Sequence, residues 1–167
     1  GTFGAFATQS FHETKNFTCG EGGALLINDP QYIERAEIIR EKGTNRKAFF
    51  RGEVDKYSWR DTGSSFGLSD INAAYLWGQM EQRESIIRKR RRVFERYREA
   101  LEPEAARFGY RIPRVPDGDT PGYHLFYVLA PDTETRNRAL ATLRERGVQA
   151  TFHYVPLHSS PGGRRFA

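Results

Sequence analysis

The order of short apolar segments and longer helical segments predicts an α/β protein. Residues 4–11 and 24–27 have the length and composition of strands. Apolar residues recur at helical spacing from residue 32 and again from residue 69. A further strand, helix and strand are expected between residues 124 and 154. Alternation of this kind is typical of domains in which helices cover a sheet.

The composition excludes several classes of protein. Of the 167 residues, 38% are hydrophobic and 28% charged, a balance typical of a globular protein rather than a disordered or fibrous one. No apolar run approaches the roughly 18 residues of a membrane span, and no secretory leader is recognised. The lone Cys19 cannot form an internal disulfide, so a cytoplasmic location is expected. The net charge of +5 suits anionic partners without choosing among them.

The first strand is expected to be buried and to end near Phe11, with a loop over residues 12–17. In open α/β sheets, ligands bind beyond the carboxyl ends of strands. Lys15 in this loop is therefore a candidate functional residue, although an isolated lysine is usually an exposed surface residue. Glycines at positions 20–23 permit tight turns before the second strand.

A helix and a long loop are predicted next. Asp29 is a plausible N-cap, Pro30 suits the first turn, and Gly43 is expected to end the helix. Residues 44–67 show no regular period and are rich in aromatic and charged side chains. A loop of this length inside a domain is usually functional or lies at an interface.

One long helix of about thirty residues is expected from Ser69 to just before Pro103, well beyond the usual helix length. It contains the basic run Arg88–Arg92, which raises the alternative of a nucleic-acid-binding protein. Glu95 and Glu99 follow on the same patterned helix, so a solvated helix face is the simpler interpretation and no nucleic acid is expected.

A second α/β unit is predicted after a proline-rich boundary over residues 102–119. It has strands at 124–129 and 148–154 and a helix at 137–146 that Gly147 closes. The four histidines lack zinc-like spacing to the cysteine or to one another, so no metal site is expected.

Five segments of the chain, in the right order, resemble one enzyme family. They are FHETKN at 11–16, GEGG at 20–23, AEIIREKGTNR at 36–46, GSSFGLSD at 63–70 and FHYVPLH at 152–158. The chain is similar through these segments to the DegT/DnrJ/EryC1/StrS sugar aminotransferases. The resemblance implies the pyridoxal-phosphate (PLP) transferase fold of type I. Residues 1–100 would then form the C-terminal part of the large domain, and residues 101–167 most of a small α/β domain.

The resemblance also assigns roles to four residues. Lys15 matches the lysine that holds PLP covalently, and Ser10 matches a serine that binds the cofactor phosphate. Ser65 stands where many members have an asparagine that reaches the cofactor phosphate of the neighbouring subunit. His153 matches a histidine near the substrate, and a histidine satisfied within a strand is an equally good interpretation. A homodimer with shared active sites is implied.

Within the family, the similarity is greatest to enzymes that aminate C4 of dTDP-4-keto-6-deoxy-D-glucose. Such enzymes take the amino group from glutamate and give dTDP-4-amino-4,6-dideoxy-D-galactose for surface polysaccharide. A transaminase for another ketosugar is the near alternative. Dehydratase relatives have histidine in place of the lysine, and Lys15 argues against them. Family members have a large portion before the lysine strand, so these 167 residues alone are expected to be inactive.

Overall fold

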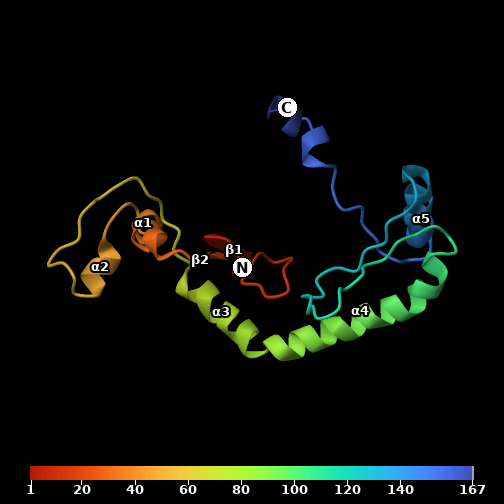
Figure 1. Ribbon diagram of the computed structural model, residues 1–167, viewed down its shortest axis with the longest axis horizontal. Helices are drawn as coiled ribbons and strands as arrows, with labels where there is room; N and C mark the ends of the chain where they lie inside the picture. The colour runs from red at the N-terminus through yellow and green to blue at the C-terminus, as the bar shows by residue number, and fades with distance from the viewer. Residues whose placement is uncertain (167) are drawn as a thin grey trace. The chain divides into compact units, whose positions relative to one another are not determined.

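The computed structural model describes residues 1–166, which divide into two compact units. The first unit is Gly1–Val93 together with Thr120–His124, and the second is Phe94–Asp119 together with the chain from Leu125 onward. The strands β1 and β2 and the helices α1 to α3 all belong to the first unit, and α5 belongs to the second (Figure 1). The division of the complete fold into a large domain up to residue 100 and a small domain from residue 101 remains a prediction.

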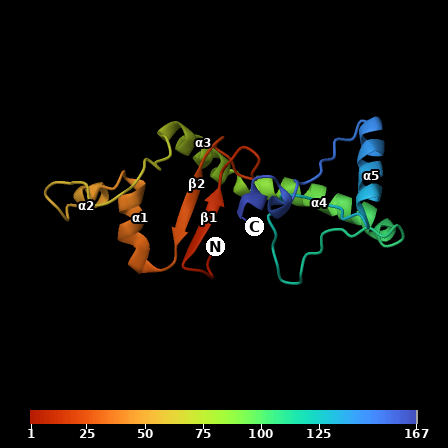
Figure 2. The ribbon, with the colours of Figure 1, turned by 90° about the horizontal axis from the view of Figure 1, so that it is seen from above.

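The two predicted N-terminal strands are present and form an antiparallel pair. β1 spans Phe6–Ser10 and β2 spans Gly23–Ile27, with Phe6 opposite Ile27 and Ser10 opposite Gly23 (Figure 2). The expectation that the first strand is buried is wrong for this chain, because four of its five residues are exposed. Backbone hydrogen bonds between β1 and β2 pair the N–H and C=O groups along one edge of each strand. No other element among residues 1–166 pairs with the outer edge of either strand.

The predicted helix start at Asp29 is confirmed. Its side chain accepts a hydrogen bond from the amide of Gln31, with Pro30 in the first turn of the short 3-10 helix η1 (Pro30–Tyr32). The α-helix α1 (Ile33–Arg40) follows directly. Gly43 lies just beyond it with a φ of 79°, a conformation that favours glycine.

The loop expected over residues 44–67 contains a short helix that the periodicity does not reveal, α2 (Arg46–Phe50). Arg51 follows α2 and donates to Glu53 at 2.7 Å and to Glu37 of α1 at 2.8 Å. These bonds, first from Glu53 and then from Glu37, raise the pKa of Arg51, and Arg51 in turn lowers the pKa of Glu53. The ion pairs therefore tie the end of α2 to α1.

The long helix expected from Ser69 is two helices. α3 spans Asp70–Glu81 and α4 spans Arg83–Ala105, and the chain breaks its helical course at Gln82. The expected end before Pro103 is wrong, since Pro103 lies inside the last turn of α4. No helix of residues 1–166 is both long and apolar enough to cross a lipid bilayer.

Loss of the Ser69 cap is expected to destabilise the protein measurably. Ser69 is the N-cap of α3, and its hydroxyl accepts the amide of Asn72 at 3.2 Å. The Ser69→Ala variant should lower the free energy of unfolding by about 1 kcal/mol, because that amide loses its acceptor. Urea denaturation of the full-length protein measures the change. Ser69→Asp restores an acceptor and should recover the stability; equal losses in both variants would contradict the cap assignment.

The second unit contains fewer elements than the sequence predicts. Neither 124–129 nor 148–154 forms a strand, and the one ladder contact in this unit up to residue 166 is an isolated bridge between Arg111 and Leu129. A strand requires a backbone partner along its length, and alternation of side chains alone does not supply one. The helix is confirmed but begins earlier, as α5 (Thr133–Glu145), and Gly147 with a φ of 74° follows it.

Asp132 is the N-cap of α5 and explains its earlier start. Its carboxylate accepts the amide of Thr135 at 2.7 Å and the Thr135 hydroxyl at 3.0 Å. These two bonds lower the pKa of Asp132 below its ordinary value. The cap is therefore intact at pH values above that ordinary value, and it is lost as the pH falls through the lowered pKa.

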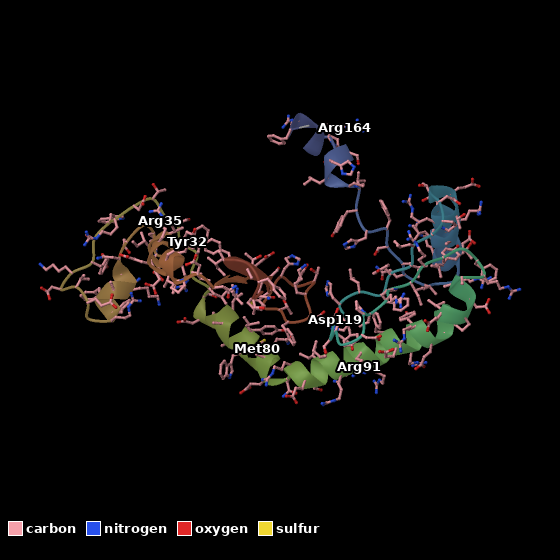
Figure 3. All side chains as sticks on the ribbon, viewed as in Figure 1. Tyr32, Arg35, Met80, Arg91, Asp119 and Arg164 are labelled. Carbon is pink, nitrogen blue, oxygen red and sulfur yellow. The ribbon has the colours of Figure 1, made fainter. Side chains whose placement is uncertain are left out.

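Few side chains of the described residues are buried. Cys19, Phe94 and Pro113 are buried, as are Gly43 and the polar residue Thr44. The chain exposes 13733 Å². A compact protein of this mass exposes about 8,400 Å², and two separate compact units about 10,000 Å². Side chains stand out along both long helices, as at Met80 (Figure 3). Much apolar surface is thus available for packing against further protein.

Candidate active site

The loop between β1 and β2, residues 11–22, is closed by backbone hydrogen bonds at its base. The Phe11 amide donates to the Gly22 carbonyl at 2.8 Å, one step beyond the strand ladder. The Cys19 amide donates to the Phe11 carbonyl at 3.0 Å and closes a smaller ring inside the loop. Both ends of the segment that carries Lys15 are therefore held by the same pair of strands.

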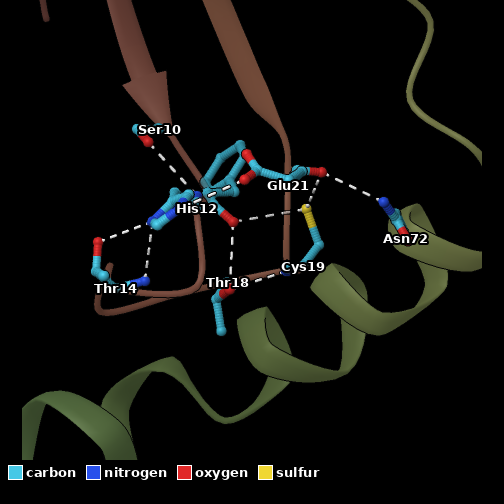
Figure 4. A network of polar contacts seen from close by, with 9 residues as sticks. Ser10, His12, Thr14, Thr18, Cys19, Glu21 and Asn72 are labelled. Atoms are coloured by element: carbon cyan, nitrogen blue, oxygen red, sulfur yellow. Dashed lines mark hydrogen bonds and ion pairs between the residues drawn. The ribbon is translucent and has the colours of Figure 1, made fainter.

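Side chains reinforce this closure (Figure 4). The Phe11 carbonyl also accepts the Thr18 hydroxyl at 3.2 Å, and the buried Cys19 thiol lies 3.5 Å from the Glu21 carbonyl. A Cβ on Gly22 would lie 2.5 Å from the Cys19 sulfur, so a larger residue does not fit there. Cys19 is thus a packing residue at the base of the loop.

Lys15 lies in the exposed part of this loop. Its backbone amide donates to the His12 carbonyl at 2.9 Å, which forms a turn. Its side chain is exposed and makes no hydrogen bond or ion pair with any of residues 1–166. The amine is therefore accessible to a ligand.

Ser10 lies at the start of the same loop as the last residue of β1. Its hydroxyl oxygen accepts the His12 amide at 3.4 Å, and the side chain is exposed. Because a hydroxyl also carries a proton, Ser10 remains able to donate to an anion such as a phosphate oxygen. Ser10 thus lies at the end of β1 and Lys15 in the loop that follows it, and their roles as cofactor-binding residues remain predictions.

The imidazole of His12 contacts both sides of the loop. Its Nδ1 accepts the Thr14 amide at 3.2 Å and lies 2.9 Å from the Thr14 hydroxyl. Its Nε2 lies 3.4 Å from a carboxylate oxygen of Glu21. The Glu21 carbonyl in turn accepts the side-chain amide of Asn72 on α3 at 3.3 Å.

The residue after Lys15 is fixed by a distant segment of the same unit. Asn16 donates from its side-chain amide to the Gly122 carbonyl, and its Oδ1 lies 2.8 Å from Nδ1 of His124. Arg90 on α4 donates to the His124 carbonyl at 3.5 Å. Residues separated by more than one hundred positions in the chain are thereby joined beside the lysine.

Of the other two predicted site residues, Ser65 makes no hydrogen bond with Lys15 or Ser10 among residues 1–166, and His153 belongs to the second unit. Ser65 is exposed and forms an isolated bridge with Glu41 just after α1. His153 is exposed in the second unit, with its ring 4.8 Å from that of Tyr154. Their roles toward cofactor and substrate remain predictions.

Sequence reasoning missed the polar residues around the lysine. The sequence assigns no individual role to His12, Asn16, Glu21 or His124. The spacing His-x-Thr over 12–14 is a local signal, because side chains two residues apart in a turn bond one another readily. The Asn16–His124 contact has no local signal. Within residues 1–166, no three metal-ligating side chains are grouped as a metal site requires.

The fold is that of sugar aminotransferases of known structure. The aminotransferase TlmJ of Streptoalloteichus hindustanus superposes with a TM-score of 0.78 at 28% identity, over 97% of this chain and 44% of that one. PseC of Helicobacter pylori, an aminotransferase of pseudaminic acid biosynthesis, gives a TM-score of 0.82 at 24% identity, over 99% of this chain and 43% of that one. The fold therefore places the chain in the class of PLP-dependent aminotransferases.

The family follows from the sequence match. The model of the DegT/DnrJ/EryC1/StrS aminotransferase family matches residues 1–164, and the chain belongs to this family. The family's aminotransferases are PLP-dependent. The resemblance carried by the five segments is thereby confirmed.

Two curated relatives are similar over almost the whole chain. The dTDP-4-dehydro-2,3,6-trideoxy-D-glucose 4-aminotransferase of Saccharopolyspora spinosa is 29% identical over 96% of this chain and 42% of its own length. The UDP-4-amino-4,6-dideoxy-N-acetyl-β-L-altrosamine transaminase of Helicobacter pylori is 29% identical over 95% of this chain and 40% of its own. The chain thus spans about two fifths of the curated relatives it matches.

The donor set of the loop fits part of a PLP site. A free primary amine on Lys15 suits an aldehyde, and the Ser10 hydroxyl suits a phosphate. The loop supplies neither an acidic partner for the pyridine nitrogen nor an aromatic ring stacked on it in any contact of residues 1–166. The chain's residues therefore fit the aldehyde and phosphate ends of the cofactor.

Proposed function

We propose that the complete protein is a PLP-dependent aminotransferase that acts on a nucleotide-linked sugar. The observation that carries the proposal is the accessible Lys15 amine in a closed loop after β1, within a chain that matches the family over residues 1–164. Lys15 holds the cofactor aldehyde, and Ser10 binds its phosphate.

The two residues perform different tasks. PLP, when bound, supplies an electron sink at the carbon that gains or loses a proton. Lys15 Nζ would hold the cofactor by its aldehyde, and the same amine would carry the proton that transamination moves between two carbon atoms. The Ser10 hydroxyl donates to the phosphate and orients the cofactor relative to Lys15. Ser65 is assigned to the cofactor phosphate of a partner subunit, and His153 to the substrate.

The proposed acceptor is dTDP-4-keto-6-deoxy-D-glucose, aminated at C4 to dTDP-4-amino-4,6-dideoxy-D-galactose for surface polysaccharide. The names of both curated relatives place an amino group at C4 of a nucleotide-linked deoxysugar, which supports C4 as the site of transfer. Those relatives differ in the nucleotide and the sugar, so another ketosugar is the second candidate. A screen of dTDP- and UDP-linked 4-ketosugars distinguishes them.

The remaining parts of the proposal concern partners and location. Glutamate is the amino donor, and the kinetics are ping-pong because donor and acceptor use the same site in turn. A cytoplasmic homodimer with shared active sites is expected, and the net charge of +5 favours an anionic nucleotide sugar. Neither nucleic acid nor membrane binding is proposed: Arg90 of the basic run already contacts His124 within the protein.

Borohydride trapping tests the proposed function. The full-length protein is incubated with PLP, reduced with borohydride, digested and mapped by mass spectrometry. A phosphopyridoxyl group on Lys15 is expected, because the Lys15 amine is accessible and fixed in its loop. An adduct on another lysine would overturn the residue assignment. A folded full-length protein without any adduct in excess PLP would overturn the aminotransferase function.

A further inference from the structure

Thr14 and Asn16, the residues on either side of Lys15, both make hydrogen bonds, whereas the Lys15 side chain makes none with residues 1–166. On one side, the Lys15 amide bonds to the His12 carbonyl and Thr14 bonds to the His12 ring. On the other side, Asn16 bonds to Gly122 and His124. The backbone at residue 15 is thereby fixed from two directions, and the amine projects from a defined point.

The bonds of His12 determine which of its nitrogens carries the proton. The Thr14 amide can only donate, so Nδ1 must be an unprotonated acceptor. The proton of the neutral ring therefore resides on Nε2, which faces the Glu21 carboxylate at 3.4 Å. The Thr14 hydroxyl, 2.9 Å from Nδ1, must likewise act as donor. A single tautomer thus satisfies every polar contact of the ring.

We propose that His12 is a positioning residue for Lys15, acting through Thr14 and Glu21 to hold the loop in the shape that presents the amine to PLP. The Thr14 contact sets the turn over residues 12–15. The Glu21 contact joins this turn to the opposite limb of the loop, which Asn72 anchors to α3. The Glu21 side chain is 83% exposed, so water weakens this contact of the neutral ring with the carboxylate, and the Thr14 bonds contribute more.

The inference rests on the proposed function, and its physical basis is pre-organisation. An exposed loop that samples many shapes brings its lysine to the cofactor aldehyde in only a fraction of them. Misplacement of a reacting group by about 1 Å lowers a rate by as much as about 100-fold. His12 is not expected to touch the cofactor, so it acts on the rate of attachment through Lys15 alone.

The test measures how fast the cofactor-free, full-length protein attaches PLP to Lys15. Samples are reduced with borohydride at successive times, and the adduct is quantified by mass spectrometry. The His12→Phe variant keeps an aromatic ring but loses both polar contacts, and we expect its attachment rate to fall about 10- to 100-fold. Amide hydrogen exchange of residues 12–16 should become faster in the same variant without cofactor, a readout that is independent of activity.

Two further variants and a control complete the design. His12→Asn should recover most of the rate, because an asparagine oxygen accepts the amide two residues on in the same kind of turn. Thr14→Val removes one donor at an exposed position and should slow attachment about fivefold, which tests the inference even where His12→Phe does not fold. His158→Phe, at an exposed histidine outside the loop, should match the wild type.

The outcomes separate this inference from the proposed function. Absence of any adduct in the wild type overturns the proposed function itself. Attachment to Lys15 in the wild type, with equal rates and equal exchange in His12→Phe and Thr14→Val, overturns the positioning role and leaves the aminotransferase function standing. Slower attachment with faster exchange in these variants, and recovery in His12→Asn, supports it.

Discussion

Replacing Lys15 by alanine in the full-length protein is expected to lower the rate of transamination by about 1,000-fold or more. The variant loses both the amine that bonds the cofactor and the group that moves the proton, and proton transfer by a positioned side chain alone contributes about 100- to 10,000-fold. The rate is measured as conversion of a nucleotide-linked 4-ketosugar with glutamate as donor. The borohydride adduct at position 15 should disappear in parallel.

Stability should not change in this variant. The Lys15 side chain is exposed and has no partner among residues 1–166, so the free energy of unfolding should stay within about 0.5 kcal/mol of the wild type. Lys89→Ala, at an exposed position on α4, is the matched control and should retain full activity. Substantial activity in Lys15→Ala, or its loss in Lys89→Ala, would contradict the assignment of Lys15.

The second large effect concerns folding, at Gly43. This residue has a φ of 79°, and a Cβ there would overlap the carbonyl oxygen of Asp61 and lie 3.3 Å from the amide of Gly63. The atoms that a Cβ would overlap belong to the backbone, so no rotation of a side chain can relieve the clash. Gly43→Ala should therefore lower the free energy of unfolding by about 3 kcal/mol or more, through strain and overlap together.

Gly78 provides the control for this variant. It lies within α3, and a Cβ on it meets no atom within 4 Å. Gly78→Ala should stabilise the protein by about 0.5–1 kcal/mol, since alanine loses less conformational freedom in a helix. Urea denaturation of the full-length protein compares the two. A Gly43→Ala variant as stable as the wild type would show that the crossing of residues 43 and 61 is not as close as described.

Local signals predicted the local structure well. The caps at Asp29 and Ser69 are hydrogen-bonded as their residue types require, and Gly147 ends α5. Each depends on bonds between residues two to four apart, which the sequence displays directly. The same holds for the turn at Lys15, where the amide bonds three residues back.

Features that depend on distant partners were predicted less well. The strands expected at 124–129 and 148–154 have the right composition but lack a neighbouring strand, so they do not form. Likewise, apolar residues at helical spacing on both sides of the basic run did not reveal the break at Gln82 between α3 and α4. Composition shows that a segment can form a strand, but the strand forms only where a neighbouring strand supplies backbone hydrogen bonds.

The same distinction applies to the site. Lys15 was singled out because it lies in the FHETKN segment that resembles a family motif, and Ser10 directly precedes that segment. The structure places Ser10 at the end of β1 and Lys15 in the loop that follows, and their roles toward the cofactor stay predictions. The contact between Asn16 and His124 joins residues 108 positions apart, and nothing near either residue signals it. Ser65 and His153 lie apart from that loop in sequence, and their roles stay predictions.

In this loop, the residues that hold its shape are different from the residue that carries the amine. This difference affects how such a protein can change during evolution. Mutations at Cys19 or Gly22 disturb packing and are removed by selection for folding, whatever the reaction. A mutation at Lys15, whose exposed side chain has no partner among residues 1–166, is expected to leave the fold intact and, under the proposed function, to alter only the chemistry. Selection for folding and selection for activity therefore act on different codons of one short segment. Under the proposed function, a substitution at this one position would therefore give a well-folded descendant with an altered reaction.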